Sequence, residues 1–364
     1  MKKSFGVAKV FLVLLLWIGL LHLVAKLSLY APQSIDFPYY NTDLARYTRA
    51  EAIWAHFDGI HYLRLASYGY RDTGTQAFFP IYPALVSALK GIGLSPLYSA
   101  LLISYCSLFF AIWGIRVLFP SRFWPTFLTL LLFPTSFFLV SVYTESLFLA
   151  LVIWFFVFLK AKKWGVAALL SGIASGTRLV GILLALSLAV EFFRSYGPKA
   201  FKRPSLLLLL LLSCGGLIGY MWFLLVRFHD PFMFFHVQPM FGAGRSGSEI
   251  ILLPQVIYRY LKMIFTVDST TLLYQRVWLE LMTTLVVIYL LFKNYKRIVL
   301  SQTVFLAGSI LLPTLTGSLS SMPRYALVLV PFLVAGSRPR LVLIPFGLLL
   351  IYLFSVFASG QFVA

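Results

Sequence analysis

One stretch interrupts an otherwise apolar sequence: residues Trp54 to Pro83, which read WAHFDGIHYLRLASYGYRDTGTQAFFPIYP. Its ionisable and amide side chains stand among aromatic ones; they are Asp58, His56, His61, Arg64, Arg71, Asp72 and Gln76. Long apolar runs with short polar breaks lie on both sides. We therefore expect the apolar runs to build the fold and this stretch to hold the chemistry.

The composition places the chain among integral membrane proteins. Of its 364 residues, 60% are hydrophobic and 11% are charged. Apolar runs of this length, separated by short polar breaks, are typical of polytopic membrane proteins. Because lipid offers no hydrogen bonds to a bare backbone, the runs must be helical. The sequence thus predicts an all-α polytopic membrane protein with a single domain, residues 1–364, and about 11 transmembrane helices.

Basic residues outnumber acidic ones, with 30 lysines and arginines against 11 aspartates and glutamates. In a membrane protein such residues collect in cytoplasmic loops, and an anionic lipid substrate would use the same excess. No nucleic-acid partner is expected. The two cysteines, Cys106 and Cys214, both lie in apolar runs and indicate neither a disulfide framework nor a metal site.

Basic clusters and apolar runs together predict the topology. We expect an uncleaved first helix with its N-terminus in the cytoplasm, a first outside loop at about 31–77 and a long outside loop at about 227–275. The other apolar runs are 78–94, 97–118, 123–142, 146–159, 164–193, 204–226, 276–292, 298–317, 325–336 and 341–358. The clusters expected inside are 160–163, 194–203, 293–297 and 338–340. The run 164–193 must then be a hairpin of two short helices, with Arg178 at its outer tip.

One of the early runs cannot be a full crossing if the loop at 31–77 and Glu145 both lie outside. The prolines within 123–142 favour this run as the broken or re-entrant one. Two arginines near the end of 97–118 favour 78–94 instead. We favour 123–142, and 78–94 stays open as the alternative.

The periodicity after residue 50 predicts an amphipathic helix in the first outside loop. One stripe carries, at helical spacing, Trp54, Asp58, His61, Leu65 and Tyr68. An adjacent apolar stripe suits the membrane surface and contains Ile53, Phe57 and Ile60. Gly69 suits the end of the helix. We expect a juxtamembrane helix at the interface, with Asp58 and His61 one turn apart.

Acidic residues are scarce, so each one near a helix on the outer side is a candidate for function. Asp58 stands among aromatic side chains, which suits a half-buried carboxylate with a shifted pKa; a solvated loop charge is the alternative. Glu145 stands where two apolar runs meet, either for a functional reason or as a charge favoured by the helix dipole. Asp36 and Asp43 lie outside the aromatic stripe and are not expected to take part.

Arg178 and Arg324 both flank apolar runs on the expected outer side, against the positive-inside trend. A phosphate held outside the membrane would explain both arginines. An ion pair with Glu145 is the rival explanation, and both stay open.

Other motifs exclude familiar sites. The segment GAGRSG at 242–247 matches G-x-G-x-x-G, but no strand precedes it, so we expect a flexible outside loop rather than a dinucleotide site. The sequence contains no D-x-D pair, Walker loop, H-E-x-x-H or G-x-S-x-G motif. The lack of a D-x-D pair counts against a metal-held nucleotide-sugar site.

Several motifs between residues 50 and 330 resemble those of the phosphatidylinositol-glycan class V family, GPI mannosyltransferase II. The most specific combines Phe57-Asp58-Gly-Ile-His61, Gly69-Tyr70 and Ala77-Phe78-Phe79-Pro80-x-x-Pro83. The others are Tyr143-Thr-Glu-Ser-Leu-Phe148, Ser175-Gly-Thr-Arg178 with Gly181-Ile-Leu, and Met322-Pro-Arg324-Tyr325. The stretch around Arg178 lacks the asparagine of the family motif.

The resemblance implies a GT-C glycosyltransferase, expected to be a hexosyl- or mannosyltransferase, that uses a polyprenyl- or dolichyl-phosphate sugar. It implies Asp58 as the catalytic base, and we expect His61 and Glu145 to act beside it as orienting groups. The residues expected to bind substrate are Arg178, Arg324, Tyr325, Trp54 and Tyr70, with the two arginines on the phosphate. No metal or cofactor is expected, because a lipid-monophosphate leaving group requires none. The acceptor is expected to be a glycolipid or glycan.

A transporter or flippase of a polyprenyl-linked lipid is the alternative from another class. It would use the same arginines and aromatic loop but needs no base. An inside-facing gate acid would favour it, and Glu191 is the only inside candidate in the sequence. We expect an integral protein of the inner, plasma or endoplasmic reticulum membrane, with the site on the outer or luminal side.

Overall fold

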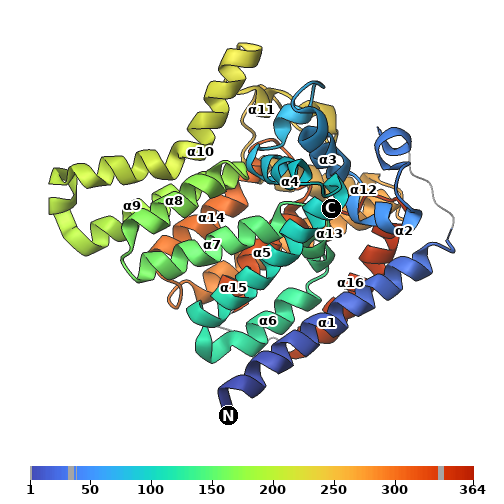
Figure 1. Cartoon of the computed structure of the whole chain (residues 1–364), viewed down its shortest axis with the longest axis horizontal. Helices are drawn as coiled ribbons and strands as arrows, with labels where there is room; N and C mark the ends of the chain where they lie inside the picture. The colour runs from blue at the N-terminus through green and yellow to red at the C-terminus, as the bar shows by residue number, and fades with distance from the viewer. Residues whose placement is uncertain (1, 32–36, 38, 335–339) are drawn as a thin grey trace.

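The fold is a bundle of helices, seen in a computed structural model that describes residues 2–31, 37, 39–334 and 340–364 (Figure 1). Within these ranges there is no strand, and one isolated β-bridge pairs Ile251 with Thr316. The predicted all-helical class is therefore confirmed. Asp36 of the first loop and Arg338 of the last basic cluster lie outside the described residues.

Five helical stretches among the described residues are long and apolar enough to cross a bilayer. They are Gly6–Ser28 within α1 (Lys2–Ser28), α5 (Pro96–Leu118), Leu179–Ala200 around α9 (Leu183–Tyr196), α10 (Pro204–Phe228) and α13 (Leu272–Asn294). Shorter apolar helices are α8 (Trp164–Ser175), α14 (Leu300–Thr314), α15 (Met322–Val334) and Val342–Ala358 within α16 (Arg340–Ala358). These helices support an integral membrane protein, and the number of about 11 crossings stays a prediction.

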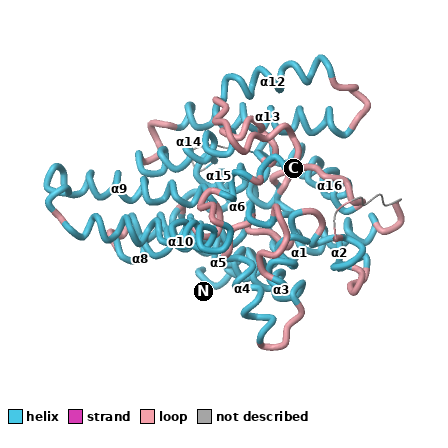
Figure 2. Tube along the Cα trace, turned by 90° about the horizontal axis from the view of Figure 1, so that it is seen from above, coloured by secondary structure: helices cyan, strands magenta, loops and turns pink. Residues whose placement is uncertain are grey.

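The long and short helices pack into one core. In Figure 1 the axes of α5, α7 (Glu145–Lys160), α8 and α14 are roughly aligned. Helix α1 lies against α16 along one edge of the bundle. Large aromatic side chains fill this core: Phe155 of α7, Phe305 of α14, Phe354 of α16 and Phe137 before α7 are fully buried. Seen from above, α12 (Leu253–Thr266) and α13 lie on one flank, and α3 (Asp58–Tyr68) and α4 (Ile81–Gly91) lie on the opposite one (Figure 2).

The chain reverses sharply just before α3. Thr48 and Glu51 form a capping box at the start of α2 (Arg49–Ala52), and a short 3₁₀ turn, Ile53–Ala55, follows. Phe57 then adopts φ 57° and ψ −119°, a conformation that is rare for a bulky residue. The rings of Phe37, Phe357 and Phe362 surround Phe57 at centroid distances of 5.4, 5.5 and 5.4 Å. The helix starts at Asp58, directly after this reversal.

The expectation that an apolar stripe of this helix faces the membrane surface is wrong, and its position at the interface stays a prediction. The stripe assigned to the membrane surface is buried inside the protein, with Ile53 and Ile60 0% exposed and Phe57 7% exposed. Because Phe57 interrupts the helix, Trp54 is not on the α3 stripe that carries Asp58 and His61. The predicted end at Gly69 is confirmed, since its N–H bonds the Leu65 carbonyl and its φ is 71°.

The two candidates for the re-entrant segment, residues 78–94 and 123–142, differ in where their ends lie in the bundle. The start of α5 meets the first loop, because Tyr47 Oη accepts from the N–H of Leu97 and Tyr98 Oη donates to Glu51. Residues 78–94, which contain the 11-residue α4, thus begin and end at the same end of the bundle.

Residues 123–142 instead lead back along the bundle. They comprise α6 (Phe123–Leu132), which follows the far end of α5, and a 3₁₀ turn, Ser136–Val140. At their end, the N–H of Val142 bonds the carbonyl of Trp54 at 2.8 Å, beside α3. Proline does break this run, as expected, but its ends lie at opposite ends of the bundle, so the geometry favours 78–94 as the segment that returns.

The hairpin expected at 164–193 is present. Helices α8 and α9 are joined by a 3₁₀ turn, Leu179–Ile182, and Arg178 stands immediately before this turn. Helix α8 approaches α10 closely through glycines: a Cβ on Gly216 would lie 2.2 Å from the Gly172 carbonyl oxygen and 2.4 Å from the Gly176 nitrogen. This contact fixes the end of α8 and hence the position of Arg178.

Candidate active site

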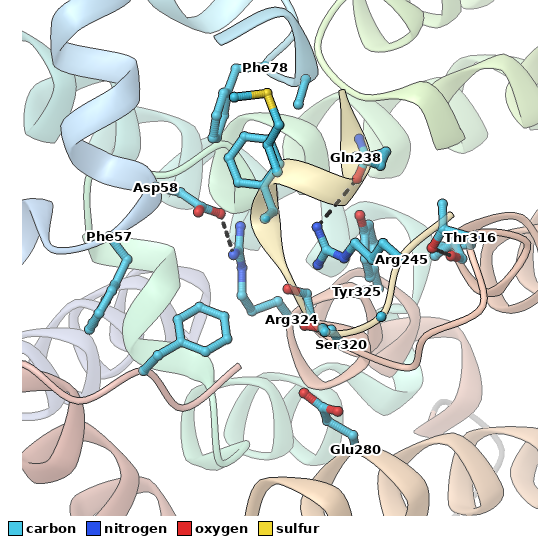
Figure 3. Close-up of a pocket in the computed structure, with 18 of the residues that line it drawn as sticks. Phe57, Asp58, Phe78, Gln238, Arg245, Glu280, Thr316, Ser320, Arg324 and Tyr325 are labelled. Carbon is cyan, nitrogen blue, oxygen red and sulfur yellow. Dashed lines mark hydrogen bonds and ion pairs between the residues drawn. The ribbon is translucent and has the colours of Figure 1, made fainter. Parts of the chain in front are cut away.

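A cavity of about 1370 Å³ opens between α3 on one side and α12 and α13 on the other. It is also lined by residues of α15, by the loop after a 3₁₀ turn, Gln238–Phe241, and by residues 360–362 beyond α16. Figure 3 shows Asp58 and Arg324 facing one another at the cavity, with Arg245 on the far side of Arg324. The cavity therefore gathers groups from the first loop, the long second loop and the last third of the chain.

Asp58 is the first residue of α3 and lines the cavity with its side chain 23% exposed. Its Oδ2 accepts a hydrogen bond from Arg324 Nη1 at 2.6 Å. Burial alone would raise the pKa of the Asp58 carboxyl, but the charge and hydrogen bond of Arg324, helped by His61 and Arg245, hold this pKa below its ordinary value. Asp58 is thus a carboxylate at neutral pH.

Glu145 lies behind this pair, at the start of α7, and is fully buried. Its Oε1 accepts from Arg324 Nε and from Arg178 Nη1, both at 3.0 Å. Its Oε2 has no hydrogen-bond partner among the described residues. The guanidinium of Arg324 lies 4.7 Å from the ring centre of Tyr143, and that of Arg178 lies 4.5 Å from the ring centre of Tyr325.

Asp58, Arg324, Glu145 and Arg178 form a chain of alternating charge. The two carboxylates balance the two guanidinium groups, and the rings of Tyr143 and Tyr325 cover them. Of the two explanations for these arginines, the structure therefore supports the ion pair with Glu145. A buried guanidinium that already holds two carboxylates has little charge left for a substrate phosphate.

His61 lies one turn after Asp58 and also lines the cavity. Its ring stands 4.9 Å from that of Phe78 and 5.5 Å from that of Phe37, and its Nδ1 has no partner among the described residues. Burial lowers the pKa of His61, and the opposing charge of Asp58 does not restore it. The imidazole is therefore neutral at pH 7 and offers one donor and one acceptor.

The remaining residues expected to bind substrate divide into two groups. Tyr325 lines the cavity beside Arg178. Trp54 does not: it packs between His22 and Phe354, at ring distances of 4.8 and 5.3 Å. Tyr70 also has a structural position, because its hydroxyl donates to the Phe78 carbonyl at 2.6 Å and its ring packs on Tyr220.

Sequence reasoning missed a second group of charged residues at the cavity: Arg245, Arg259, Lys262, Arg276 and Glu280. Arg245 belongs to the segment interpreted as a flexible loop, and α12 provides Arg259 and Lys262. The signal was present, because basic residues in an outside loop violate the positive-inside trend just as Arg178 does. The helical spacing of Val256, Tyr260 and Met263 also indicated α12.

Two further expectations concern an acid at the inside end of the bundle and a metal site, both separate from Asp58. The inside acid Glu191 pairs with Arg194 at 3.3 Å and accepts from Ser301, and it does not line the cavity. Within the described ranges, no three His, Cys, Asp or Glu side chains are grouped to hold a metal ion. The expectation that no metal is required stays a prediction.

Comparisons of the chain with family models, with curated proteins and with solved structures find no match. The family resemblance of the motifs accordingly remains a prediction. The cavity itself combines an ionised carboxylate, a neutral imidazole beside it and a wall of cationic side chains.

Proposed function

We propose that the protein is a membrane glycosyltransferase of the GT-C type. It transfers a sugar, expected to be mannose or another hexose, from a polyprenyl or dolichyl phosphate to a hydroxyl group of a glycolipid or glycan. The observation that carries this proposal is the placing of Asp58, an ionised carboxylate at the wall of a large cavity in a helical membrane protein. The excess of cationic over acidic lining residues adds support, because the donor is a phosphate ester.

The reaction is a single displacement at the anomeric carbon. The acceptor hydroxyl oxygen attacks that carbon from the face opposite the phosphate, while the bond between the carbon and the phosphate oxygen breaks. The electron pair of this bond stays on the leaving phosphate, and the hydroxyl proton passes to the Asp58 carboxylate. The configuration at the anomeric carbon is therefore inverted.

The low pKa of Asp58 suits this role in one respect and limits it in another. It keeps the carboxylate ionised at neutral pH, so the base is always available. A weak base does not deprotonate an unactivated alcohol, so the proton moves only after attack has made the hydroxyl oxygen acidic. Arg324 holds Oδ2 and thereby fixes the direction in which the carboxylate presents its other oxygen.

The neighbouring residues act on this base or on the substrate. His61 is neutral and accessible from the cavity, so it can donate to or accept from a sugar or acceptor hydroxyl. Glu145 is fully buried and acts through Arg324, which makes it a positioning residue. Tyr325 and Arg178 form part of the cavity wall next to this network.

The orientation follows from the charge pattern of the sequence. The basic clusters at 160–163 and 194–203 are expected in the cytoplasm, at the far ends of α7 and α9 from the cavity. The cavity would then open on the periplasmic, extracellular or luminal side. Lipid-linked donors and glycan acceptors are both membrane-bound substrates that this position suits.

The test uses the full-length protein in lipid nanodiscs with a radiolabelled polyprenyl-phosphate sugar and a lipid extract as the source of acceptors. Transfer of label to a new lipid or glycan by the wild type, and its loss in Asp58→Asn, is the expected result. A parallel assay in liposomes measures movement of a fluorescent polyprenyl-linked lipid between leaflets. Lipid movement without sugar transfer, unaffected by Asp58→Asn, would replace this proposal with the transporter or flippase.

A further inference from the structure

The wall of the cavity opposite Asp58 carries four cationic side chains that the ion-pair network does not include. Arg245 comes from the loop after Gln238–Phe241, Arg259 and Lys262 come from α12, and Arg276 comes from α13. Figure 3 shows Arg245 reaching into the cavity, with Gln238 above its guanidinium and joined to it by a dashed line. These side chains come from three separate elements that meet at this wall.

These four cations are not held in salt bridges as Arg178 and Arg324 are. Arg245 Nη1 donates to the amide oxygen of Gln238, and Arg259 Nη1 donates to the Gly317 carbonyl, both at 3.3 Å. Arg276 Nε is buried and has no acceptor among the described residues. No salt bridge within the described part of the chain involves any of the four.

The balance of charge in the cavity therefore favours an anion. Its described lining residues include six lysines and arginines against two acids, Asp58 and Glu280. Glu280 accepts a hydrogen bond from Tyr260 Oη at 2.5 Å, which occupies one of its oxygens. Adding the buried Glu145 still leaves an excess of cations. A phosphate bearing one or two negative charges would meet several donors at this wall.

Helix α12 also has the surface of a helix that lies on a membrane. Its outward face carries Tyr258, Leu261 and Phe265, which are 68%, 46% and 88% exposed. It leads through residues 267–271 into α13, one of the candidate membrane spans. A helix with exposed apolar side chains that runs directly into a span lies at the interface, with those side chains in lipid.

The cavity joins this membrane-facing helix to the cationic wall by apolar side chains. Met263 of α12, Leu273 and Val277 of α13 and Leu312 of α14 all line it. A ligand with a phosphate head and a long apolar chain would contact the cationic wall with its head and the apolar lining with its chain. Neither a free phosphate nor a neutral lipid uses both the cations and the apolar lining.

We propose that Arg245, Arg259, Lys262 and Arg276 bind the phosphate of an isoprenoid lipid phosphate, whose chain leaves the cavity between α12 and α13. The inference rests on the proposed function in taking a lipid phosphate as donor. It moves the phosphate away from Arg178 and Arg324, whose task is to hold Asp58. The reacting sugar then lies between the cationic wall and the carboxylate.

The experiment measures binding of farnesyl monophosphate to the full-length protein in phosphatidylcholine nanodiscs, with farnesol and inorganic phosphate as separate ligands. The variants are Lys262→Gln, which removes a lysine whose side chain makes no hydrogen bond to any described residue, and the pair Arg245→Gln/Lys262→Gln. Lys199→Gln removes the same charge at the opposite end of the bundle, and Asp58→Asn removes the base. Thermal unfolding checks that each variant is folded.

We expect wild type to bind farnesyl monophosphate more tightly than farnesol or inorganic phosphate, and more weakly as salt is raised. Lys262→Gln should weaken binding roughly tenfold and the pair by more, because each lost cation removes a charge-assisted hydrogen bond. Lys199→Gln should bind like the wild type, and Asp58→Asn, which removes an acidic lining residue, should bind no more weakly than the wild type.

Two results would overturn the inference, and they differ in what they say about function. Equal affinity of wild type and the paired variant would remove the cationic wall from donor binding and leave the proposed transferase intact. Binding of inorganic phosphate as tight as that of farnesyl monophosphate would exclude the lipid. Conversely, variant-sensitive binding without any sugar transfer would support the wall and contradict the transferase.

Discussion

Asp58 and Arg324 are joined by an ion pair of 2.6 Å although 266 positions separate them in the sequence. The same guanidinium also bonds Glu145 at the head of α7. One arginine of α15 therefore ties together the starts of α3 and α7. The position of the proposed base depends on three helices that are remote from one another in the chain.

Replacement of Asp58 by asparagine should sharply reduce turnover in a protein that still folds, because the Asp58 side chain is 23% exposed whereas that of Glu145 is fully buried. Asparagine keeps the shape of the side chain but accepts no proton at neutral pH, so transfer should fall roughly 10²–10⁴-fold. Sugar transfer by purified protein measures this. Asp43 is an unsuitable control because it pairs with Arg64 at 2.6 Å. Asp268→Asn, in the exposed linker after α12, should retain full activity, and retention of more than about a tenth of turnover by Asp58→Asn would exclude it as the base.

Replacement of Glu145 by glutamine should destabilise the protein through its two arginine partners. Removing one member of a buried ion network typically costs about 3–5 kcal/mol, because the remaining charges lose their compensation. Thermal unfolding in detergent should show a lower midpoint, together with reduced transfer. The pair Glu145→Gln/Arg178→Gln should lose less stability than the sum of the single changes. Strict additivity would mean that the two side chains do not interact.

The stability of the protein should fall with acidity because of His56. Burial lowers the pKa of this imidazole to about 4, despite the hydrogen bond from its Nδ1 to the Phe357 carbonyl at 3.1 Å. Between pH 6.5 and about 4 the unfolded chain takes up a proton that the folded protein does not. The contribution of His56 to the free energy of unfolding is therefore complete above pH 6.5. It decreases as the pH falls below 6.5, by on the order of 3 kcal/mol at about pH 4.

The unfolding midpoint measured from pH 7.5 to 4.5 checks this pH dependence. His56→Gln should reduce the slope without removing it, since His61 also has a lowered pKa. The exposed His229 serves as control, and His229→Asn should keep the slope of the wild type. An unchanged slope in His56→Gln would show that this imidazole does not titrate as inferred.

A nitroxide on α12 should report a lipid environment. In a background in which both cysteines are replaced by serine, spin-labelled Phe265→Cys should be accessible to oxygen and shielded from a water-soluble nickel reagent. Spin-labelled Ser269→Cys, in the linker to α13, should show the opposite pattern. If the label at position 265 is as accessible to nickel as the label at 269, α12 does not lie on the membrane.

Gly216→Ala should disturb the contact between α8 and α10. The added Cβ would lie 2.2–2.4 Å from backbone atoms of Gly172 and Gly176, which cannot move as a side chain can. We expect a loss of about 1–3 kcal/mol and a lower unfolding midpoint. Gly215→Ala and Gly219→Ala meet no atom within 4 Å and should be neutral or slightly stabilising. Equal midpoints for all three would contradict the close approach.

Hydropathy and charge predicted much of this architecture because the membrane imposes them directly. Apolar runs gave the helical class, and basic clusters gave the hairpin that presents Arg178. The same charge rule singled out Arg324, which the structure brings to Asp58. The hairpin and the candidacy of Arg324 both follow from where basic residues lie relative to the membrane. This can be inferred from single residues, without knowledge of their contacts.

The orientation of α3 was not predictable in the same way. Periodicity carries one stripe from Trp54 to Tyr68, but the backbone reversal at Phe57 breaks it, and Phe57 is itself neither glycine nor proline. In a membrane protein an apolar stripe faces either lipid or other helices, and hydrophobicity does not distinguish the two. Two of the three rings that surround Phe57 come from residues about 300 positions later, which no local pattern contains.

The contacts of His56 and Phe57 with Phe357 also have a consequence for assembly. The segment around Asp58 leaves the ribosome early, whereas α16 follows only after most of the other helices have been inserted. Until α16 and the residues after it arrive, Phe57 has only the ring of Phe37 out of the three that surround it in the structure. The site around Asp58 is therefore incomplete during synthesis, and a chain that ends before residue 340 should have no activity.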